Sequence, residues 1–196
     1  FMRTHERCGV LGVRLVGRDG EQQLCARSFP TPWTWFLLRT GIHKYFGKRS
    51  MFDYLNLDHK TAIKCDWVVG CFYMVRKEVV DTVGLFDSRF FLYFEEVDHC
   101  LSVTKAGWDV YFLPDTSVVH IGGESAKSDG ELTEKGKQIE SLQIESELLY
   151  FRKNYGVMGL FSTILLNTVA DTIILFKYLL KLSGKTKTLA VLTHLR

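Results

Sequence analysis

The sequence of 196 residues predicts an α/β protein. Two runs with the composition of buried strands, Cys8–Val16 and Asp66–Val75, are separated by turn signals from segments with the apolar spacing of helices. The clearest of these helices opens on an acidic cluster at Glu95. A hydrophobic fraction of 46% in a chain of this length is enough to bury a core, so we expect a globular protein.

The N-terminal third is predicted to hold one strand and little other regular structure. Cys8–Val16 runs into Gly17-Arg18-Asp19-Gly20, a turn sequence that ends the strand. Ser28–Trp35 contains two prolines and two tryptophans without periodicity and is predicted to be a packed loop. Residues 36–64 are assigned to helix and loop, with a basic patch at Lys44, Lys48 and Arg49.

The central third alternates strands and helices. Asp66–Val75 is predicted to be a strand interrupted at Gly70, where a bulge or a ligand is expected. Arg76–Val83 fits a short helix closed by Gly84. A second helix is expected from Glu95 to Ala106, since one side of it is apolar.

The remaining elements of the body are two strands and a longer helix. Trp108–Leu113 and Thr116–His120 are predicted to be separate strands because Pro114-Asp115 lies between them. Glu131–Asn154 has the apolar spacing of an amphipathic helix.

The tail, Gly156–Leu182, is about as long as a bilayer-spanning helix needs to be. Thr163, Asn167 and Asp171 recur every four residues, so a helix here has a polar stripe beside a wide apolar face. A mid-span Asp costs about 2.5 to 3.5 kcal/mol when a helix is inserted into a bilayer. Four lysines, Lys177, Lys181, Lys185 and Lys187, lie at the end of this stretch and beyond it. We favour amphipathic helices in or against the cytoplasmic face of a membrane, with a true span and core packing as alternatives.

This interpretation divides the chain into a body, residues 1–155, and a membrane-associated helical tail, residues 156–196. The charges vary along it. Residues 1–50 carry nine Lys and Arg against three Asp and Glu, residues 51–150 carry nine against eighteen, and residues 151–196 carry seven against one. An acidic centre suits a metal or a cationic transition state, and basic ends suit phosphates or an anionic membrane.

Several classes of protein lose support from the motifs. The five cysteines are odd in number and form no CxxC pair, which argues against a disulfide framework and a zinc ribbon and favours a reducing compartment. The sequence has no GxGxxG, GxxxxGK[ST], HExxH or GxSxG motif. Nucleotide-fold dehydrogenases, P-loop ATPases, zincins and serine hydrolases are therefore not indicated.

Three carboxylates, Glu95, Glu96 and Asp98, stand at the start of the predicted helix. Acidic residues in a first turn are often only helix caps. Here an aromatic cluster, Phe90 to Phe94, precedes them and can desolvate one carboxylate into a general base. His120, at a strand end beside a Gly-rich loop, is either a structural residue or a contact for a metal or phosphate.

The central part of the chain has an ordered set of acidic, aromatic, Gly and His positions. They are Asp66-Trp67, Gly70, Arg76, Gly84-Leu85-Phe86-Asp87, Phe90-Phe91, Tyr93-Phe94-Glu95-Glu96-Val97-Asp98, Ala106-Gly107, Pro114, Val119-His120 and Ser125. This order resembles the C-terminal half of family 2 glycosyltransferases, with the rhamnosyltransferase-like enzymes as the nearest group. The resemblance extends over about residues 10–156.

The resemblance implies part of a GT-A fold with a mixed sheet, a nucleotide-diphosphate sugar donor, a divalent metal (Mg²⁺ or Mn²⁺), and inversion at the anomeric carbon. Glu96 takes the position of the usual Asp base and is one methylene longer, and Glu95 is the alternative base. Asp98 matches a second acidic position. His120 matches a contact to the metal or diphosphate. The acceptor pocket is implied to include Asp66, Trp67, Gly70 and Cys71.

The function expected from the resemblance is transfer of a sugar to a lipid-linked or polysaccharide acceptor. The location is the cytoplasm, peripheral to the inner face of the plasma membrane, and no nucleic-acid partner is expected. Because the resemblance is to the C-terminal half alone, a truncated remnant that binds acceptor or membrane without catalysis is the main alternative. A membrane protein whose tail is its principal part is a third.

Overall fold

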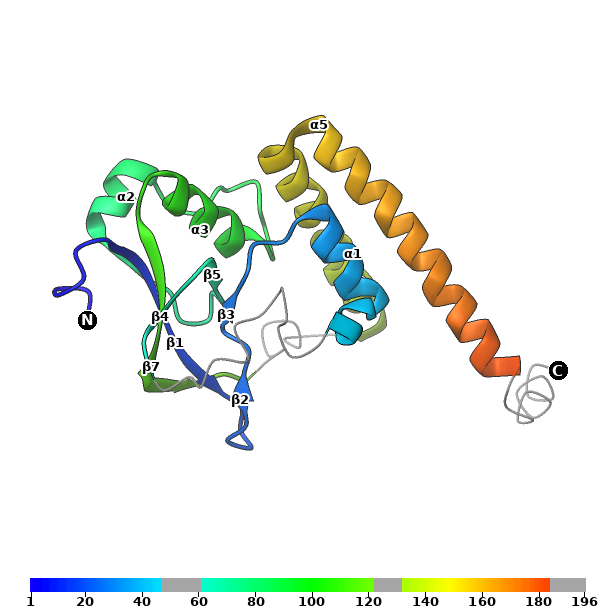
Figure 1. Ribbon diagram of the computed structural model, residues 1–196, viewed down its shortest axis with the longest axis horizontal. Coiled ribbons are helices and arrows are strands. Elements are labelled where there is room, and N and C mark those ends of the chain that lie inside the picture. The colour runs from blue at the N-terminus through cyan, green and yellow to red at the C-terminus, as the bar shows by residue number, and fades with distance from the viewer. Residues whose placement is uncertain (47–60, 122–131, 184–196) are drawn as a thin grey trace.

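The computed structural model describes residues 1–46, 61–121 and 132–183, and the account below concerns these residues. Figure 1 shows an α/β body with a curled mixed sheet, from which a long C-terminal helix extends. The predicted fold class is therefore confirmed at this level. Lys48, Arg49, Ser125, Lys185 and Lys187, which entered the predictions, lie outside the described residues.

Two long strands form the centre of the sheet. β1 (Cys8–Val16), as predicted, pairs in parallel with β7 (Asp109–Val119). Shorter strands add to them in antiparallel orientation, and β3 and β5 form a separate small sheet. The short strands are β2 (Gln22–Gln23), β3 (Ala26–Arg27), β4 (Ile63–Cys65), β5 (Trp67–Val68) and β6 (Met74–Val75).

Two predictions about strands are wrong. Trp108–Leu113 and Thr116–His120 belong to one strand, β7, because the pairing with β1 shifts register after Leu113 and resumes at Ser117, which accommodates the proline. Asp66–Val75 is not one strand. A turn at Gly70 separates β5 from β6, which belong to different sheets.

The predicted loop over Ser28–Trp35 is wrong from Pro32 onward, where α1 (Pro32–Thr40) begins. Thr31 caps this helix in a capping box with Thr34, and a proline occupies the first turn, where its missing N–H costs nothing. Gly41, with φ 73°, ends it, and a 3₁₀ helix, η1 (Ile42–Phe46), follows with Lys44 exposed.

The two helices predicted in the central third are confirmed. α2 (Lys77–Val83) ends at Gly84, and α3 (Glu95–Lys105) covers the sheet (Figure 1). The imidazole of His99 fixes the two to each other, because its Nε2–H donates to the carbonyl of Gly84 at 3.0 Å. The core lies between α3 and the strands, with Val10, Val68, Val103, Val110 and Phe112 almost fully buried.

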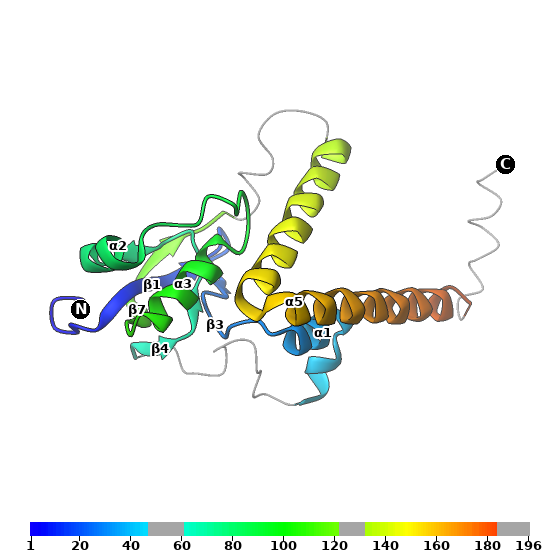
Figure 2. The same cartoon turned by 90° about the horizontal axis from the view of Figure 1, so that it is seen from above.

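The C-terminal helix α5 (Leu132–Ser183) covers both the helix predicted from residue 131 and the predicted tail. Gly156, with φ 70° and ψ −164°, breaks it, so its two halves run in different directions (Figure 2). The break coincides with the predicted boundary between body and tail, although the division into domains stays a prediction. The second half packs on α1 through Phe36, Leu37 and Ala170.

Candidate active site

The chain enters α3 through two strained residues. Tyr93 (φ 66°) and Phe94 (φ 65°) both have left-handed conformations, which cost L residues about 1 to 2 kcal/mol each. Packing compensates at Phe94, whose buried ring lies edge-on to Trp35 at 5.5 Å and against Tyr150 at 5.3 Å. Such strain is concentrated at functional sites, and here it directs the first turn of α3 toward a pocket.

This pocket has a volume of about 140 Å³ and lies between α1, α3 and the small sheet. Aromatic rings form much of its wall, and a guanidinium, a carboxylate and an amide are its main polar groups. The lining residues are Arg27, Ser28, Pro30, Thr34, Trp35, Leu38, Trp67, Tyr93, Phe94, Glu96, Val97 and Gln143. A small cavity with rings and a few convergent polar groups is typical of a ligand site.

Glu96 is the carboxylate of the pocket. Its Oε2 atom is buried and has no hydrogen-bond partner. Burial raises the pKa of Glu96 to about 7, with a smaller contribution from the negative charge of Glu95, while backbone N–H groups, including that of Gly70, oppose the rise. Near neutral pH this group therefore exists in both protonation states and can accept a proton from a bound ligand.

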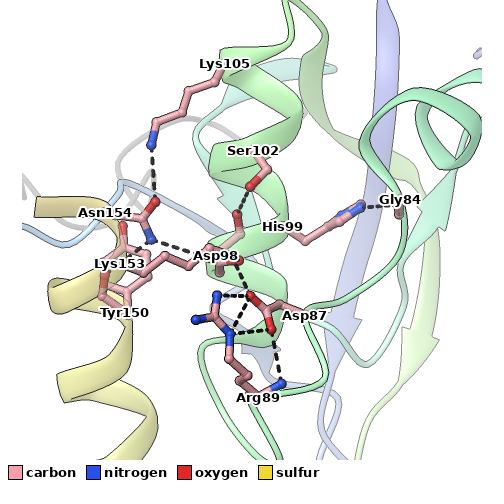
Figure 3. A network of polar contacts seen from close by, with 10 residues as sticks. All are labelled: Gly84, Asp87, Arg89, Asp98, His99, Ser102, Lys105, Tyr150, Lys153 and Asn154. Carbon is pink, nitrogen blue, oxygen red and sulfur yellow. Dashed lines mark hydrogen bonds and ion pairs between the residues drawn. The ribbon is translucent and has the colours of Figure 1, made fainter. Parts of the chain in front are cut away.

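The other two carboxylates of the first turn have different surroundings. Glu95 is half-buried with an unpartnered Oε2, and it is not part of the pocket wall. The side chain of Asp98 is only 3% exposed and faces α5, where it accepts from Lys153 Nζ at 2.6 Å and from Asn154 Nδ2 at 2.8 Å (Figure 3). Of the three predicted catalytic carboxylates, only Glu96 enters the pocket.

Lys153 links Asp98 to a second carboxylate. Its ammonium also lies 2.8 Å from Asp87, which Arg89 contacts at 2.6 Å (Figure 3). These hydrogen bonds, first from Arg89 and then from Lys153, hold the pKa of Asp87 well below its usual range. The network joins α3 to α5 and thereby fixes the helix that presents Glu96.

The residues expected to line the acceptor pocket divide into two groups. Trp67 is in the pocket wall, where its indole N–H donates to the Ser28 carbonyl at 2.9 Å and Arg27 lies 5.1 Å above its ring. Asp66 is not in the pocket wall, and its carboxylate accepts from the Phe29 N–H at 2.8 Å.

Gly70 and Cys71 form the turn beside Glu96. A β-carbon at Gly70 would lie 3.8 Å from Glu96 Oε1, so the backbone here runs directly along the carboxylate. Cys71 is an exposed residue. Partial desolvation of its thiol raises the pKa of that thiol, and the negative charge of Glu96 adds a smaller contribution. Neither residue is in the pocket wall.

His120 lies at the end of β7 and away from the pocket wall. Its Nδ1 is 2.7 Å from Gln23 Oε1, which can only accept, so Nδ1 carries the proton and Nε2 is left able to bind a cation. Over residues 1–46, 61–121 and 132–183, no three His, Cys, Asp or Glu side chains are grouped to hold a metal. These residues thus do not form a complete metal site, and the expected divalent metal stays a prediction.

Sequence reasoning missed several polar or aromatic groups of the pocket, among them Arg27, Trp35 and Gln143. Trp35 was placed in a loop, although the Thr31-Pro32 cap signal would have put it in a helix. No local signal identifies Arg27 or Gln143, because they reach the pocket through tertiary packing.

Comparison with known proteins gives three relatives of interest. The N-acetylglucosaminyl-diphospho-decaprenol L-rhamnosyltransferase of Mycobacterium tuberculosis is 29% identical over 130 residues, 63% of this chain and 40% of the relative. The dTDP-rhamnosyl transferase RfbF of Shigella flexneri is 29% identical over 98 residues, 49% of this chain and 33% of the relative. Rhamnosyltransferase WbbL of Escherichia coli is 32% identical over 63 residues, which are 32% of this chain and 24% of the relative.

No family model and no solved structure matches the chain. The aligned parts amount to between 24% and 40% of the length of these relatives. The curated relatives are rhamnosyltransferases, and the likeness of this chain to them is a distant one at the level of the family.

Proposed function

We propose that the chain is the acceptor side of an inverting family 2 glycosyltransferase with a GT-A-like fold, which transfers rhamnose from a nucleotide-diphosphate donor to a lipid-linked or polysaccharide acceptor. The names of the three relatives support rhamnosyl transfer. The observation that carries the chemistry is Glu96, a half-buried carboxylate with a pKa raised to about 7 in a pocket lined by rings.

In this proposal Glu96 acts as the general base. The acceptor hydroxyl lies in the pocket and hydrogen-bonds to the carboxylate of Glu96, which is part of the pocket wall. As the hydroxyl oxygen attacks the anomeric carbon, its proton moves to Glu96 and the bond from the sugar to the diphosphate breaks. Attack from the side opposite the leaving group inverts the anomeric centre. A base with a pKa near the working pH is well matched to this step.

The other residues of the site bind and position. Trp67 and Trp35 offer ring faces to the apolar side of a sugar, and Arg27 and Gln143 offer hydrogen-bond donors to its hydroxyls. Asp98 positions the start of α3 through Lys153 and Asn154 and does not touch the acceptor. Glu96 and Asp98 therefore have separate tasks, one as the base and one as a positioning residue.

The proposal predicts that the intact protein adds one deoxyhexose to an acceptor. Purified protein is incubated with dTDP-rhamnose and a polyprenyl-diphosphate-linked N-acetylglucosamine, with Mg²⁺, with Mn²⁺ or with EDTA, and the product is measured by mass spectrometry. We expect the mass of one rhamnosyl residue to be added, and the EDTA sample tests the expected metal requirement. Binding of the acceptor without transfer from this donor or from other nucleotide sugars would instead support the non-catalytic alternative.

A further inference from the structure

The second half of α5 turns its polar residues toward the protein. Thr163 is 1% exposed, and Asn167 donates to Glu147 Oε1 at 2.6 Å. Ala170 is buried against Phe36 and Leu37 of α1. The polar stripe recognised in the sequence is therefore occupied by contacts within the chain, beside apolar residues that pack on α1.

The opposite side of this half-helix is an exposed apolar surface, which we name the outward stripe. Its residues recur every three or four positions, apart from one gap of seven, and so share one side of the helix. They are Met158 (76% exposed), Phe161 (63%), Leu165 (65%), Val169 (42%), Phe176 (62%) and Leu179 (53%). The stripe extends for about 30 Å. Contiguous apolar surfaces of this size mark interaction sites.

The threonines within the stripe expose no free donor. The hydroxyl of Thr168 donates to the Ile164 carbonyl at 2.9 Å, and that of Thr172 donates to the Thr168 carbonyl at 2.8 Å. Hydroxyl protons bonded to the same helix need no partner from the surroundings. This favours a hydrocarbon environment, where an unpaired donor would be costly, over a polar protein surface.

We propose that the outward stripe lies in the plane of an anionic lipid bilayer, at the boundary between headgroups and acyl chains. Residues 157–196, which begin with the second half of the helix, contain five Lys and Arg and a single Asp. Such an excess of positive charge is attracted to anionic headgroups by about 1 kcal/mol per residue near the surface. The same excess disfavours a second copy of this helix as the partner, because the two would repel each other.

The helix is long and apolar enough to cross a membrane, since an 18-residue window within Ser141–Leu179 meets that criterion by length and composition. Its surroundings favour the in-plane orientation. Asp171 is 62% exposed at its side chain and pairs with Arg39 of α1 at 2.5 Å. Because α1 packs along α5, a spanning helix would carry this ion pair into the hydrocarbon. Lying in the plane, the helix keeps the pair at its water side.

α1 lies between the second half of α5 and the pocket. Thr34, Trp35 and Leu38 line the pocket, while Phe36 and Leu37 pack on the inward side of α5. If the proposed function holds, the pair of helices that contacts the membrane also forms part of the pocket wall near Glu96. The membrane contact itself does not depend on that function.

Flotation with vesicles tests the contact. The intact protein is mixed with vesicles of phosphatidylglycerol and phosphatidylcholine, or of phosphatidylcholine alone, without nucleotide sugar. We expect flotation with the anionic vesicles, and a partition coefficient at least tenfold lower for the double variant Leu165→Glu/Phe176→Glu, because each buried side chain contributes about 1.5 to 3 kcal/mol. The matched control is Leu85→Glu/Phe91→Glu, which adds the same charges at exposed apolar positions outside α5.

Circular dichroism establishes that both variants are folded. Flotation of the stripe variant at the wild-type level would overturn the proposal. So would a wild-type protein that does not float and forms a dimer that the stripe variant dissociates, since the partner would then be a second copy. Because no nucleotide sugar is present in the flotation experiment, either result is independent of whether the protein transfers sugar.

The orientation is tested by nitroxide labels at single cysteines introduced at Met158, Leu165 or Phe176, in a chain with the exposed Cys71 replaced by Ser. The outer two positions are about 27 Å apart along the helix. An in-plane helix places all three labels at the same shallow depth, as measured by paramagnetic relaxation. A graded depth, with Leu165 near the bilayer centre, would contradict the in-plane orientation.

Discussion

Replacing Glu96 by Gln is expected to lower the rate of sugar transfer by about 10² to 10⁴, the contribution typical of general-base catalysis. Gln has nearly the same shape but cannot accept the proton of the acceptor hydroxyl. The pocket wall is unchanged, so the affinity for the donor should change little. The measurement is the initial rate of rhamnosyl transfer by the intact protein, with donor binding measured in parallel by calorimetry.

Glu95→Gln is the matched control, because it removes the adjacent carboxylate, which is not in the pocket wall. We expect this variant to keep most of its activity. Glu96→Asp should keep part of the activity, because it retains a carboxylate one methylene shorter. If Glu95→Gln is inactive while Glu96→Gln transfers at the wild-type rate, the base is Glu95 and our assignment is wrong.

Replacing Lys153 by Met is expected to destabilise the protein by about 3 to 5 kcal/mol, since it leaves the buried carboxylate of Asp98 without its cation. For a chain of this length the melting temperature should fall by roughly 10 °C. Asn154 would remain as a partner of Asp98, but an amide does not neutralise a charge. Chemical unfolding followed by circular dichroism measures the loss.

The matched control is Arg89→Met, which removes a cation that is 59% exposed and contacts the same network through Asp87. An exposed pair contributes about 0 to 1 kcal/mol, so little change is expected. The double variant Asp98→Asn/Lys153→Met should recover much of the stability, because no unpaired charge remains. A loss in Lys153→Met no larger than in Arg89→Met would show that the network does not hold α3 to α5.

The elements predicted correctly from the sequence have strong local patterns. β1 is an apolar run interrupted only by Arg14, α2 ends at Gly84, and α3 and both halves of α5 have helical periodicity. The short strands β2, β3 and β4 were missed, and β5 and β6 were merged into one predicted strand, because β4 and β5 form only through pairing with distant partners, β7 and β3. Pairing of this kind leaves no periodic signal in such short segments.

The candidate site was predictable in part. The acidic cluster and the aromatic residues before it indicated a desolvated carboxylate, and the structure has one at Glu96. The sequence does not show which of the three carboxylates is desolvated. That depends on α5, whose Lys153 and Asn154 bind Asp98 although they lie more than 50 positions away in the chain. The tail pattern was recognised, but only the packing on α1 shows that its apolar side faces outward.

The pH dependence of kcat/KM for transfer tests the central claim most directly. Glu96 must be ionised to act as a base, and burial raises its pKa to about 7. The rate should therefore rise with pH through a midpoint near 7, reach a plateau above it, and fall about tenfold per pH unit below it. A rate that stays constant down to pH 5 would mean that the base has the pKa of an ordinary exposed carboxylate, which would contradict the assignment of Glu96.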